Sequence, residues 1–527
     1  MATTQTDNGL PERPELRRDV TVWGSFMWGY ADVGADIYAA LGLVIAATQG
    51  AAGLAFALAG LVYIMIGLAY TELASAYPVA GGGQYFTLRG LGDFWGFVAG
   101  SALLLDYTID IALFTVASAG YVNFFIPAAA KFHMDLGPFH NVNVIWCGEA
   151  VFLIFILVLL NIRGMRESSL LNEVLGAVDI ITESSIIILG FVLAWHPDLL
   201  ARQWHQELPS LHNFMYGSSL AIISFVGLES ISQAAQETRR PATIVPRTSI
   251  TLIFTVFIFA TAFSNLSLGI LPWEAFKGRE GDPVAMLAHN IPYIGLLAGP
   301  FAAMLGATIL LISANSGVMS ASRLTYSMSQ FRFISHWFDR VHPRFHTPVR
   351  TIAVFSGIGA LQVVLAFLVG TEGALNVLGN LYAFGATLGY MLVFIAMIRL
   401  RFVDPYTPRP YKMPLNLRWK HRGRVVDIPI LAFFGFLGVS TILFEVILTH
   451  TIGRIAGPAW VLLCFLYYVW YRRSRGLPVF RSLKHDWEQQ QMKVLESAEE
   501  YDLLERYKLA LAERDRARGQ GGAGTTR

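Results

Sequence analysis

Long apolar runs recur along this chain of 527 residues and constrain its fold more than any other feature. A run of about 18 or more apolar residues can cross a bilayer as a helix. Hydrophobic residues make up 54% of the chain and charged residues only 14%, whereas soluble proteins carry about 25% charged residues. The sequence predicts an all-α integral membrane protein. Its twelve expected spans run at about 22–47, 51–77, 92–126, 142–162, 167–195, 212–237, 248–270, 292–327, 351–369, 374–399, 427–449 and 455–471.

Lys and Arg are divided unevenly between the predicted loops. Loops on the side of the N-terminus hold 21 of them, and loops on the other side hold five. Positively charged loops remain in the cytoplasm. We therefore expect a multi-pass protein of the plasma or inner cell membrane with both termini cytoplasmic. Its parts are a tail at 1–20, a twelve-span domain at 21–475 and a C-terminal tail at 476–527.

The C-terminal tail is charged and carries Leu and Tyr at helical spacing, which predicts an amphipathic helix. Two interpretations are open. The helix lies on the inner face of its own chain, or it binds a partner or a second copy.

Composition and motifs also exclude several classes of function. The net charge of +2 gives no case for nucleic acid. The sequence offers no nucleophile–base pair, metal-ligand cluster or phosphate-binding loop, so we expect neither an enzyme nor a bound cofactor or metal.

Glycines and acids cluster in the first and sixth expected spans, which are five apart. The two segments are "WGYADVGADIY" (28–38) and "SFVGLESIS" (224–232). Interrupted helices at matching positions of two five-span halves indicate an inverted repeat with a binding site near the midplane. For either segment alone, close packing by small residues is the alternative.

Acidic residues recur inside the spans, with no Lys and no Arg well inside a span to pair with them. Asp106 and Asp110 lie four apart, on one helical face, and Asp179 and Glu183 repeat that spacing. An ionised acid at the bilayer centre costs at least ~2.5–3.5 kcal/mol. Such acids therefore stay protonated, face water or bind a cation. The residues that we expect to couple transport to a proton or cation are Asp36, Asp106, Asp110, Asp179 and Glu229.

Several motifs together resemble those of the amino acid–polyamine–organocation (APC) superfamily of secondary transporters. They are "ELASAYPVAGGGQYF", "LNIRGMRESSLLN", "GLESISQAAQETRRPATIVPR", "SANSGVMSASRLTYSMSQ" and "RPYKMPL". The resemblance covers about residues 20–475. It implies ten core helices in a five-plus-five inverted repeat, with broken helices in spans one and six, two peripheral spans and alternating access.

The family resemblance also implies a substrate site. The run "GADIY" (34–38) matches a glycine-rich break whose amides take the substrate carboxylate, while the carbonyls of Ser224 and Phe225 help to hold its ammonium. Asp36 departs from this pattern, because the family usually has glycine there. Three outcomes are open: Asp36 is protonated, it points away, or the ligand is a cation without a carboxylate. The substrate-binding residues implied are Asp32, Gly34, Ala35, Asp36, Tyr38, Asp110, Ser224, Phe225 and Tyr382.

The leading interpretation is secondary active uptake of an amino acid or related amine, with a cationic substrate favoured and a proton or monovalent cation as the coupling ion. The alternative is a K⁺ importer of the same superfamily, whose tyrosines in spans one and ten match Tyr38 and Tyr382. The Thr and Ser of those importers are replaced here by Asp110 and Phe114. A non-transporting sensor on the same fold is a third class.

Overall fold

The computed structural model describes residues 21–522, apart from 80, 164–167, 236–237, 239, 346, 370–372 and 422–423. The expected N-terminal tail, 1–20, lies outside the described residues. Within them, strands occur in two antiparallel hairpins. One pairs β1 (Met134–Leu136) with β2 (Phe139–Val142), and the other pairs β3 (Asn416–His421) with β4 (Arg424–Pro429). The rest of the regular structure is helical, as the sequence predicts.

The helices that correspond to the expected spans follow one another along the chain. Those of the first half are α1 (Val22–Val33), α2 (Asp36–Thr48), α3 (Ala52–Ala76), α5 (Asp93–Val122), α7 (Val144–Arg163) and α8 (Ser168–Leu193). Those of the second half are α10 (Leu211–Leu220), α11 (Glu229–Ala234), α12 (Pro241–Ile270), α14 (Gly295–Gln330), α15 (Val349–Val369) and α16 (Ala374–Val403). Two further long helices follow, α17 (Ile430–Thr449) and α18 (Gly453–Ser474).

Short helices join these elements and form the ends of the bundle. They are η1 (Gln49–Ala51), α4 (Gly82–Leu91), α6 (Pro127–Lys131), α9 (Pro197–Gln206), η2 (Ala221–Phe225), η3 (Trp273–Phe276) and α13 (Pro283–His289). The C-terminal tail forms α19 (Trp487–Ser497) and α20 (Tyr501–Gly522).

Eleven helical stretches among the described residues are long and apolar enough to cross a membrane, by length and composition. Ten of them each correspond to one expected span. The first, Val22–Ala76, has 55 residues and contains the ranges of both the first and the second expected spans. Its helical path is interrupted at Gln49, whose φ of 52° is in the left-handed region.

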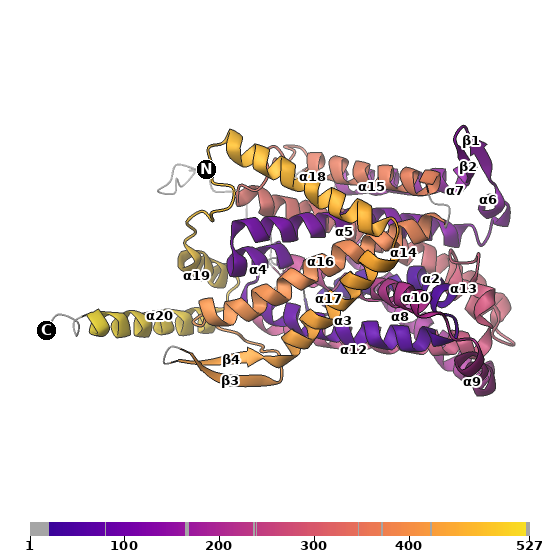
Figure 1. Ribbon diagram of the computed structural model, residues 1–527, viewed down its shortest axis with the longest axis horizontal. Helices are drawn as coiled ribbons and strands as arrows, with labels where there is room; N and C mark the ends of the chain where they lie inside the picture. Colours follow the sequence, from indigo (N-terminus) through magenta and orange to yellow (C-terminus); the bar gives the residue numbers. More distant parts are fainter. Residues whose placement is uncertain are drawn as a thin grey trace.

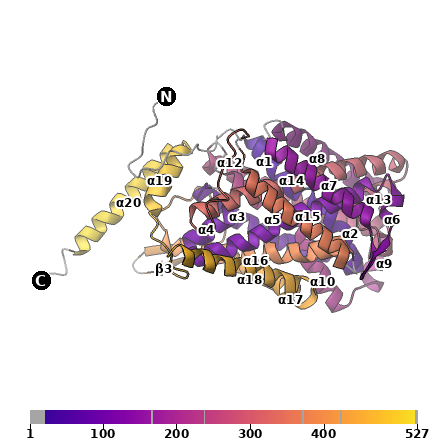
Figure 2. The same cartoon turned by 90° about the horizontal axis from the view of Figure 1, so that it is seen from above.

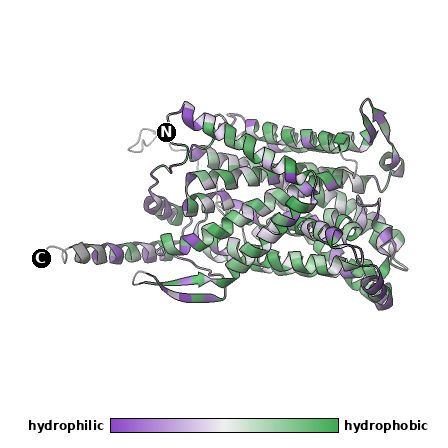
Figure 3. Ribbon diagram, in the orientation of Figure 1, coloured by the Kyte–Doolittle hydropathy of each residue, from purple (hydrophilic) through white to green (hydrophobic). Residues whose placement is uncertain are grey.

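Helix α5 is the most deeply buried of the candidate membrane helices. Of the apolar stretch of α5, 94% is buried, and its closest neighbours are α14 and α16. Only 17% of the apolar stretch of α18 is buried, so α18 presents apolar side chains outward, as expected of a helix that faces lipid. Figure 1 shows α18 and α15 along one edge of the bundle and α12 along the opposite edge. Hydrophobic colouring follows the bundle helices, and hydrophilic colouring gathers at the two ends (Figure 3).

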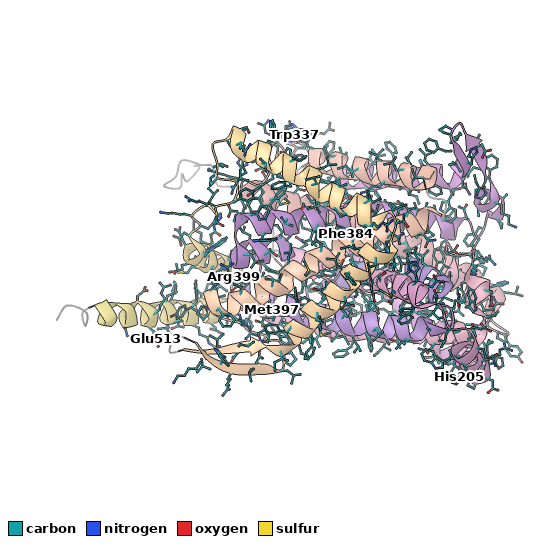
Figure 4. All side chains as sticks on the ribbon, in the orientation of Figure 1. His205, Trp337, Phe384, Met397, Arg399 and Glu513 are labelled. Carbon is teal, nitrogen blue, oxygen red and sulfur yellow. The ribbon has the colours of Figure 1, made fainter. Side chains whose placement is uncertain are left out.

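The two ends of the bundle differ. One end carries α6, α9 and the β1–β2 hairpin, and the other carries α4, α19 and the β3–β4 hairpin (Figures 1 and 2). The long helix α20 extends beyond the bundle at this second end. His205 on α9 and Glu513 on α20 lie toward opposite ends of the molecule (Figure 4).

Candidate functional site

At the first expected interruption, α1 and α2 are joined by a short turn that stays close to helical geometry. Only Gly34 and Ala35 separate the helices, and both have dihedrals in the right-handed helical region. The amide of Gly34 donates to the carbonyl of Tyr30 at 2.7 Å, so it is already engaged within the chain. Asp36 is the first residue of α2 and is 1% exposed. The positive end of a helix dipole favours a negative group at this position.

The second expected interruption is wider and lies between η2 and α11. Val226 is extended, with φ −84° and ψ 155°, and Gly227 has φ +108°. A Cβ at Gly227 would lie 3.0 Å from the carboxyl carbon of Asp32. Glycine is therefore required here for two reasons, because of the backbone angle and because Asp32 approaches the backbone closely.

Five buried carboxyl groups gather around these two interruptions. They are Asp32 from α1, Asp36 from α2, Asp106 and Asp110 from α5, and Glu229 from α11, and none is more than 5% exposed. Asp36 is close enough to interact electrostatically with all four of the others. The structure thus brings together four of the five expected coupling acids, all but Asp179, with Asp32. We call these five residues the carboxyl cluster.

Hydroxyl groups from other helices donate to part of this cluster. Tyr382 of α16 donates to Asp110 Oδ1 at 3.0 Å, and Tyr390 donates to Glu229 Oε2 at 2.7 Å. Ser313 of α14 lies 3.3 Å from the backbone carbonyl of Asp32.

The rest of the cluster has unused hydrogen-bonding capacity. Both carboxyl oxygens of Asp36, both of Asp106 and Oε1 of Glu229 are buried and accept no hydrogen bond from any donor group among the described residues. The side chain that interacts most strongly with the Asp106 carboxyl is a second carboxyl, that of Glu229. Within the described part of the chain, no Lys or Arg forms an ion pair with any member of the cluster. Buried carboxylates without cations must take up protons or bind a cation.

Asp179 belongs to a separate acidic pair on α8. It and Glu183 are fully buried, one helical turn apart. Tyr38 donates to Asp179 Oδ1 at 2.7 Å, and Tyr30 donates to Glu183 Oε2 at 2.6 Å. The hydroxyl of Tyr38, expected at the substrate, is therefore directed to α8, whereas that of Tyr382 is directed to the carboxyl cluster.

The two remaining expected residues, Ser224 and Phe225, both lie in η2 and are buried. Ser224 Oγ accepts and donates no hydrogen bond among the described residues, and Ser224 lines a small cavity of about 10 Å³ with Glu183 and Gly34. The Phe225 ring stacks on Tyr63 with 5.1 Å between centroids.

Glu72 is a buried acid that, unlike the carboxyl cluster, forms ion pairs within the protein. Arg401 Nη2 lies 2.6 Å from its Oε2, Arg409 Nε lies 3.3 Å from its Oε1, and the amide of Met413 donates to it at 2.8 Å. The sequence placed Arg401 beyond the end of a span, but α16 continues through it to Val403. This acid is therefore neutralised within the protein, unlike the carboxyl cluster.

Three tyrosines at or near the site were not predicted, and two of them contact acids. Tyr30 and Tyr390 donate to buried carboxyls, and Tyr63 packs on Phe225. Tyrosines are frequent in this chain, 20 in all, so nothing in the sequence singles these out.

Comparison with known proteins finds a family match over most of the chain. The profile of the amino acid permease family matches residues 21–470. Similar proteins include the branched-chain amino acid permease BcaP of Bacillus subtilis, which is 24% identical over 349 residues, or 64% of this chain and 71% of that protein. The cationic amino acid transporter 4 of Mus musculus is 28% identical over 388 residues, or 71% of this chain and 58% of that protein.

Another similar protein is named for a different substrate, and the match covers a similar share of this chain. The methylthioribose transporter of Bacillus subtilis is 25% identical over 391 residues, or 72% of this chain and 80% of that protein. These relatives are transporters and not enzymes. With a family match over most of its length and many apolar helices, the chain is a multi-pass membrane transporter of the APC superfamily, and it belongs to the amino acid permease family.

Proposed function

We propose that this permease imports an amino acid or related amine that carries a positive charge, coupled to protons. The observation that supports this most directly is the carboxyl cluster, which offers unpartnered oxygens of Asp36, Asp106 and Glu229. An ammonium group has three donors and one positive charge, so it would satisfy several of these oxygens at once. That one relative is named a cationic amino acid transporter agrees with this substrate class.

We infer an architecture of twelve spans in which two five-span halves form an inverted repeat. The interruptions at Gly34–Ala35 and Val226–Gly227 are five spans apart, and they meet where Asp32 approaches Gly227. Rocking of one group of helices around this point would open the carboxyl cluster alternately to the two sides. The excess of Lys and Arg in loops at the end that carries α19 supports cytoplasmic termini.

Proton coupling follows from the charge balance of the cluster. An ionised acid away from water costs at least ~2.5–3.5 kcal/mol, so the empty cluster favours protonated carboxyls. In the outward-open state a proton from outside binds one carboxyl of the cluster and the cationic substrate binds others that are ionised. Both are carried across together, and both are released after the site has opened inward. The free energy of the proton gradient would thereby drive accumulation. Asp179, held by Tyr38, is a second group that could carry a proton through this cycle.

The structure gives less support to K⁺ as the substrate. The two tyrosines that would ligate K⁺ by the family resemblance, Tyr38 and Tyr382, donate to different acids, Asp179 and Asp110. Their hydroxyls therefore do not converge on one ion. A shell of neutral oxygens of the kind that selects K⁺ is not formed by this pair.

Transport by the purified full chain in proteoliposomes tests the proposal. Uptake of labelled arginine, lysine, putrescine, leucine and ⁸⁶Rb⁺ is measured with and without an inward proton gradient. We expect gradient-driven uptake of one or more cationic amines, and its loss in Asp36→Asn. The control is Asp135→Asn, which removes an exposed carboxyl of β1 and leaves uptake unchanged. Rubidium uptake with no effect of any amine would refute the proposal.

The variant Asp36→Gly restores the residue that the family usually has at this position. If Asp36 selects for positive charge, this variant shifts preference from arginine or putrescine toward leucine. An unchanged substrate profile would show that Asp36 does not set the charge preference.

A further inference from the structure

A large hollow lies at the α19 end of the molecule, away from the carboxyl cluster. It has a volume of about 630 Å³ and lies between the end of α14, the start of α4 and the segment 483–494. Its walls therefore come from the membrane domain on one side and from the C-terminal tail on the other.

The side chains that line this hollow are basic and aromatic. Arg332 comes from the end of α14, Lys484 and His485 precede α19, and Lys493 lies on α19. No Asp or Glu belongs to the lining as described. Arg332, Lys484 and Lys493 are exposed and form no ion pair with any described residue.

Acids near the hollow are engaged elsewhere. Asp486 accepts from the amide of Gln489 at 3.0 Å and so caps α19. Glu488 pairs with Arg514 of α20. Asp93 lies 3.0 Å from His485 Nε2, but it also binds Arg472 at 2.8 Å. The positive charge of the other three basic side chains is thus left without a counterion from the protein.

Arg332 is held in an unusual backbone conformation. It follows the end of α14 with φ +58°, and the amide of the next residue, Phe333, donates back to the carbonyl of Met328 at 2.9 Å. This is the helix ending that normally has glycine at the left-handed position. An arginine there adopts strained backbone angles, and such strain is found most often at ligand-binding positions.

The tail that forms the other wall is firmly attached. Gln491 is buried, donates to the carbonyl of Ala76 at 2.9 Å and accepts from Arg89 at 3.0 Å. The Trp487 ring packs against Tyr85 with 6.0 Å between centroids. Lys484 and Lys493 flank these contacts in the sequence, so the docked tail presents both of them to the hollow.

We propose that this hollow binds a phosphate-bearing anion from the cytoplasmic side. Guanidinium and ammonium groups bind phosphate oxygens with strong, charge-assisted hydrogen bonds. The tyrosine and phenylalanine rings of the lining, Tyr85 and Phe331, provide an apolar wall beside the charges. The site is distinct from that of the transported substrate, because its charge is opposite to that of the carboxyl cluster.

The ligand would bridge the tail and the membrane domain. Since its binding groups come from both, the anion binds tightly only when the tail is docked, and by linkage it stabilises the docked tail. A soluble phosphate compound and a phospholipid headgroup share this chemistry, and the experiment distinguishes them.

Hydrogen–deuterium exchange of the full-length protein provides the test. In detergent, the probes are inorganic pyrophosphate and ATP, each compared with sodium chloride at equal ionic strength. In nanodiscs, the probe is phosphatidylglycerol added to phosphatidylcholine. We expect slower amide exchange in residues 482–495 with at least one probe. Slowing by the soluble probes alone identifies a soluble ligand, and slowing by phosphatidylglycerol alone identifies a lipid headgroup.

Matched variants distinguish a specific binding site from a general effect of surface charge. Arg332→Ala and Lys484→Ala should each weaken binding of the effective probe about 10-fold, the size expected for loss of a hydrogen bond between charged groups. Arg340→Ala removes an exposed arginine of the same loop that does not line the hollow, and it should leave binding unchanged. Equal weakening by Arg340→Ala, equal slowing by chloride, or no slowing by any probe would each overturn the proposal. None of these readouts depends on transport.

Discussion

Tyr382 donates its hydroxyl hydrogen to Asp110 Oδ1 at 3.0 Å, across the interface between α16 and α5. The two residues are 272 positions apart in the sequence, and Tyr382 is the only described residue for which a hydrogen bond to the Asp110 carboxyl is seen. The tyrosine both orients this carboxyl and disperses its charge. Under the proposed function, binding of a cationic substrate at the carboxyl cluster therefore depends on a tyrosine that is distant in the sequence.

The first prediction is that Tyr382→Phe raises the KM for the cationic substrate about 10-fold, because a hydrogen bond to a charged group is worth about 1.5–3 kcal/mol. Initial rates of uptake into proteoliposomes measure the effect. Tyr468→Phe is the control, since its hydroxyl donates to the carbonyl of Val479, outside the cluster. A KM that is unchanged in Tyr382→Phe would show that Asp110 does not contact the substrate.

Gly227 gives the second prediction. Gly227→Ala places a side chain at φ +108° and brings its Cβ to 3.0 Å from the Asp32 carboxyl carbon. We expect a loss of stability of about 1–2 kcal/mol from the backbone alone, together with loss of transport because Asp32 is displaced. Thermal unfolding in detergent and uptake in proteoliposomes measure the two effects.

Gly278→Ala provides the matched control for this variant. Its φ of +71° imposes a similar backbone cost, but nothing lies within 4 Å of the added Cβ. It should lose stability and keep transport. If both variants transport equally well, the approach of Asp32 to Gly227 has no role in the cycle.

The third prediction concerns the acidic pair on α8. Asp179→Asn removes the ionisable group that Tyr38 binds but leaves the carboxyl cluster intact. We expect it to abolish accumulation driven by a proton gradient while exchange of internal for external substrate continues. Glu149→Gln, at the partly exposed start of α7, is the control. Loss of exchange and accumulation together would place Asp179 in substrate binding instead.

The fourth prediction concerns Asp404, which lies just beyond α16 at the α19 end. Burial alone would raise the pKa of its carboxyl, but the Arg89 guanidinium, the Thr407 hydroxyl and Arg409 outweigh burial and lower the pKa below its usual value. A carboxyl whose pKa is lower in the folded state contributes stability at neutral pH, and this contribution is lost as pH falls through the folded-state pKa. Melting temperature should therefore fall in acid.

Asp404→Asn should remove much of this acid sensitivity. It also leaves the buried Arg89 without its carboxylate at 2.7 Å, so we expect a loss of about 3–5 kcal/mol at neutral pH. Asp427→Asn removes the partner of Lys412 in a much more exposed pair and should cost less than about 1 kcal/mol. Melting curves recorded between neutral and acidic pH test both statements. Equal losses in the two variants would contradict the importance assigned to burial.

Much of the fold follows from the sequence alone. Apolar length and the scarcity of charge predict membrane helices, because a bilayer accepts only segments that satisfy their own backbone hydrogen bonds. For the site, the sequence predicts a break within residues 224–232 and a functional role for the acids, since carboxylates are costly inside a membrane helix. The placing of these acids around Asp36 and Gly227 depends on how the helices pack. The extent of the two interruptions was not predictable: the turn at Gly34 is narrow, and the one at Gly227 is wide.

Only the tertiary structure decided which acids are free and which are neutralised. Glu72 and Asp36 are both buried acids at the ends or starts of helices, yet Glu72 meets Arg401 and Arg409, while Asp36 meets other carboxyls. Packing also decided the partners of two tyrosines, because Tyr38 donates to Asp179 and Tyr382 donates to Asp110. Local sequence specifies helices because their hydrogen bonds span four residues, but a side chain's partner hundreds of positions away depends on how the helices pack.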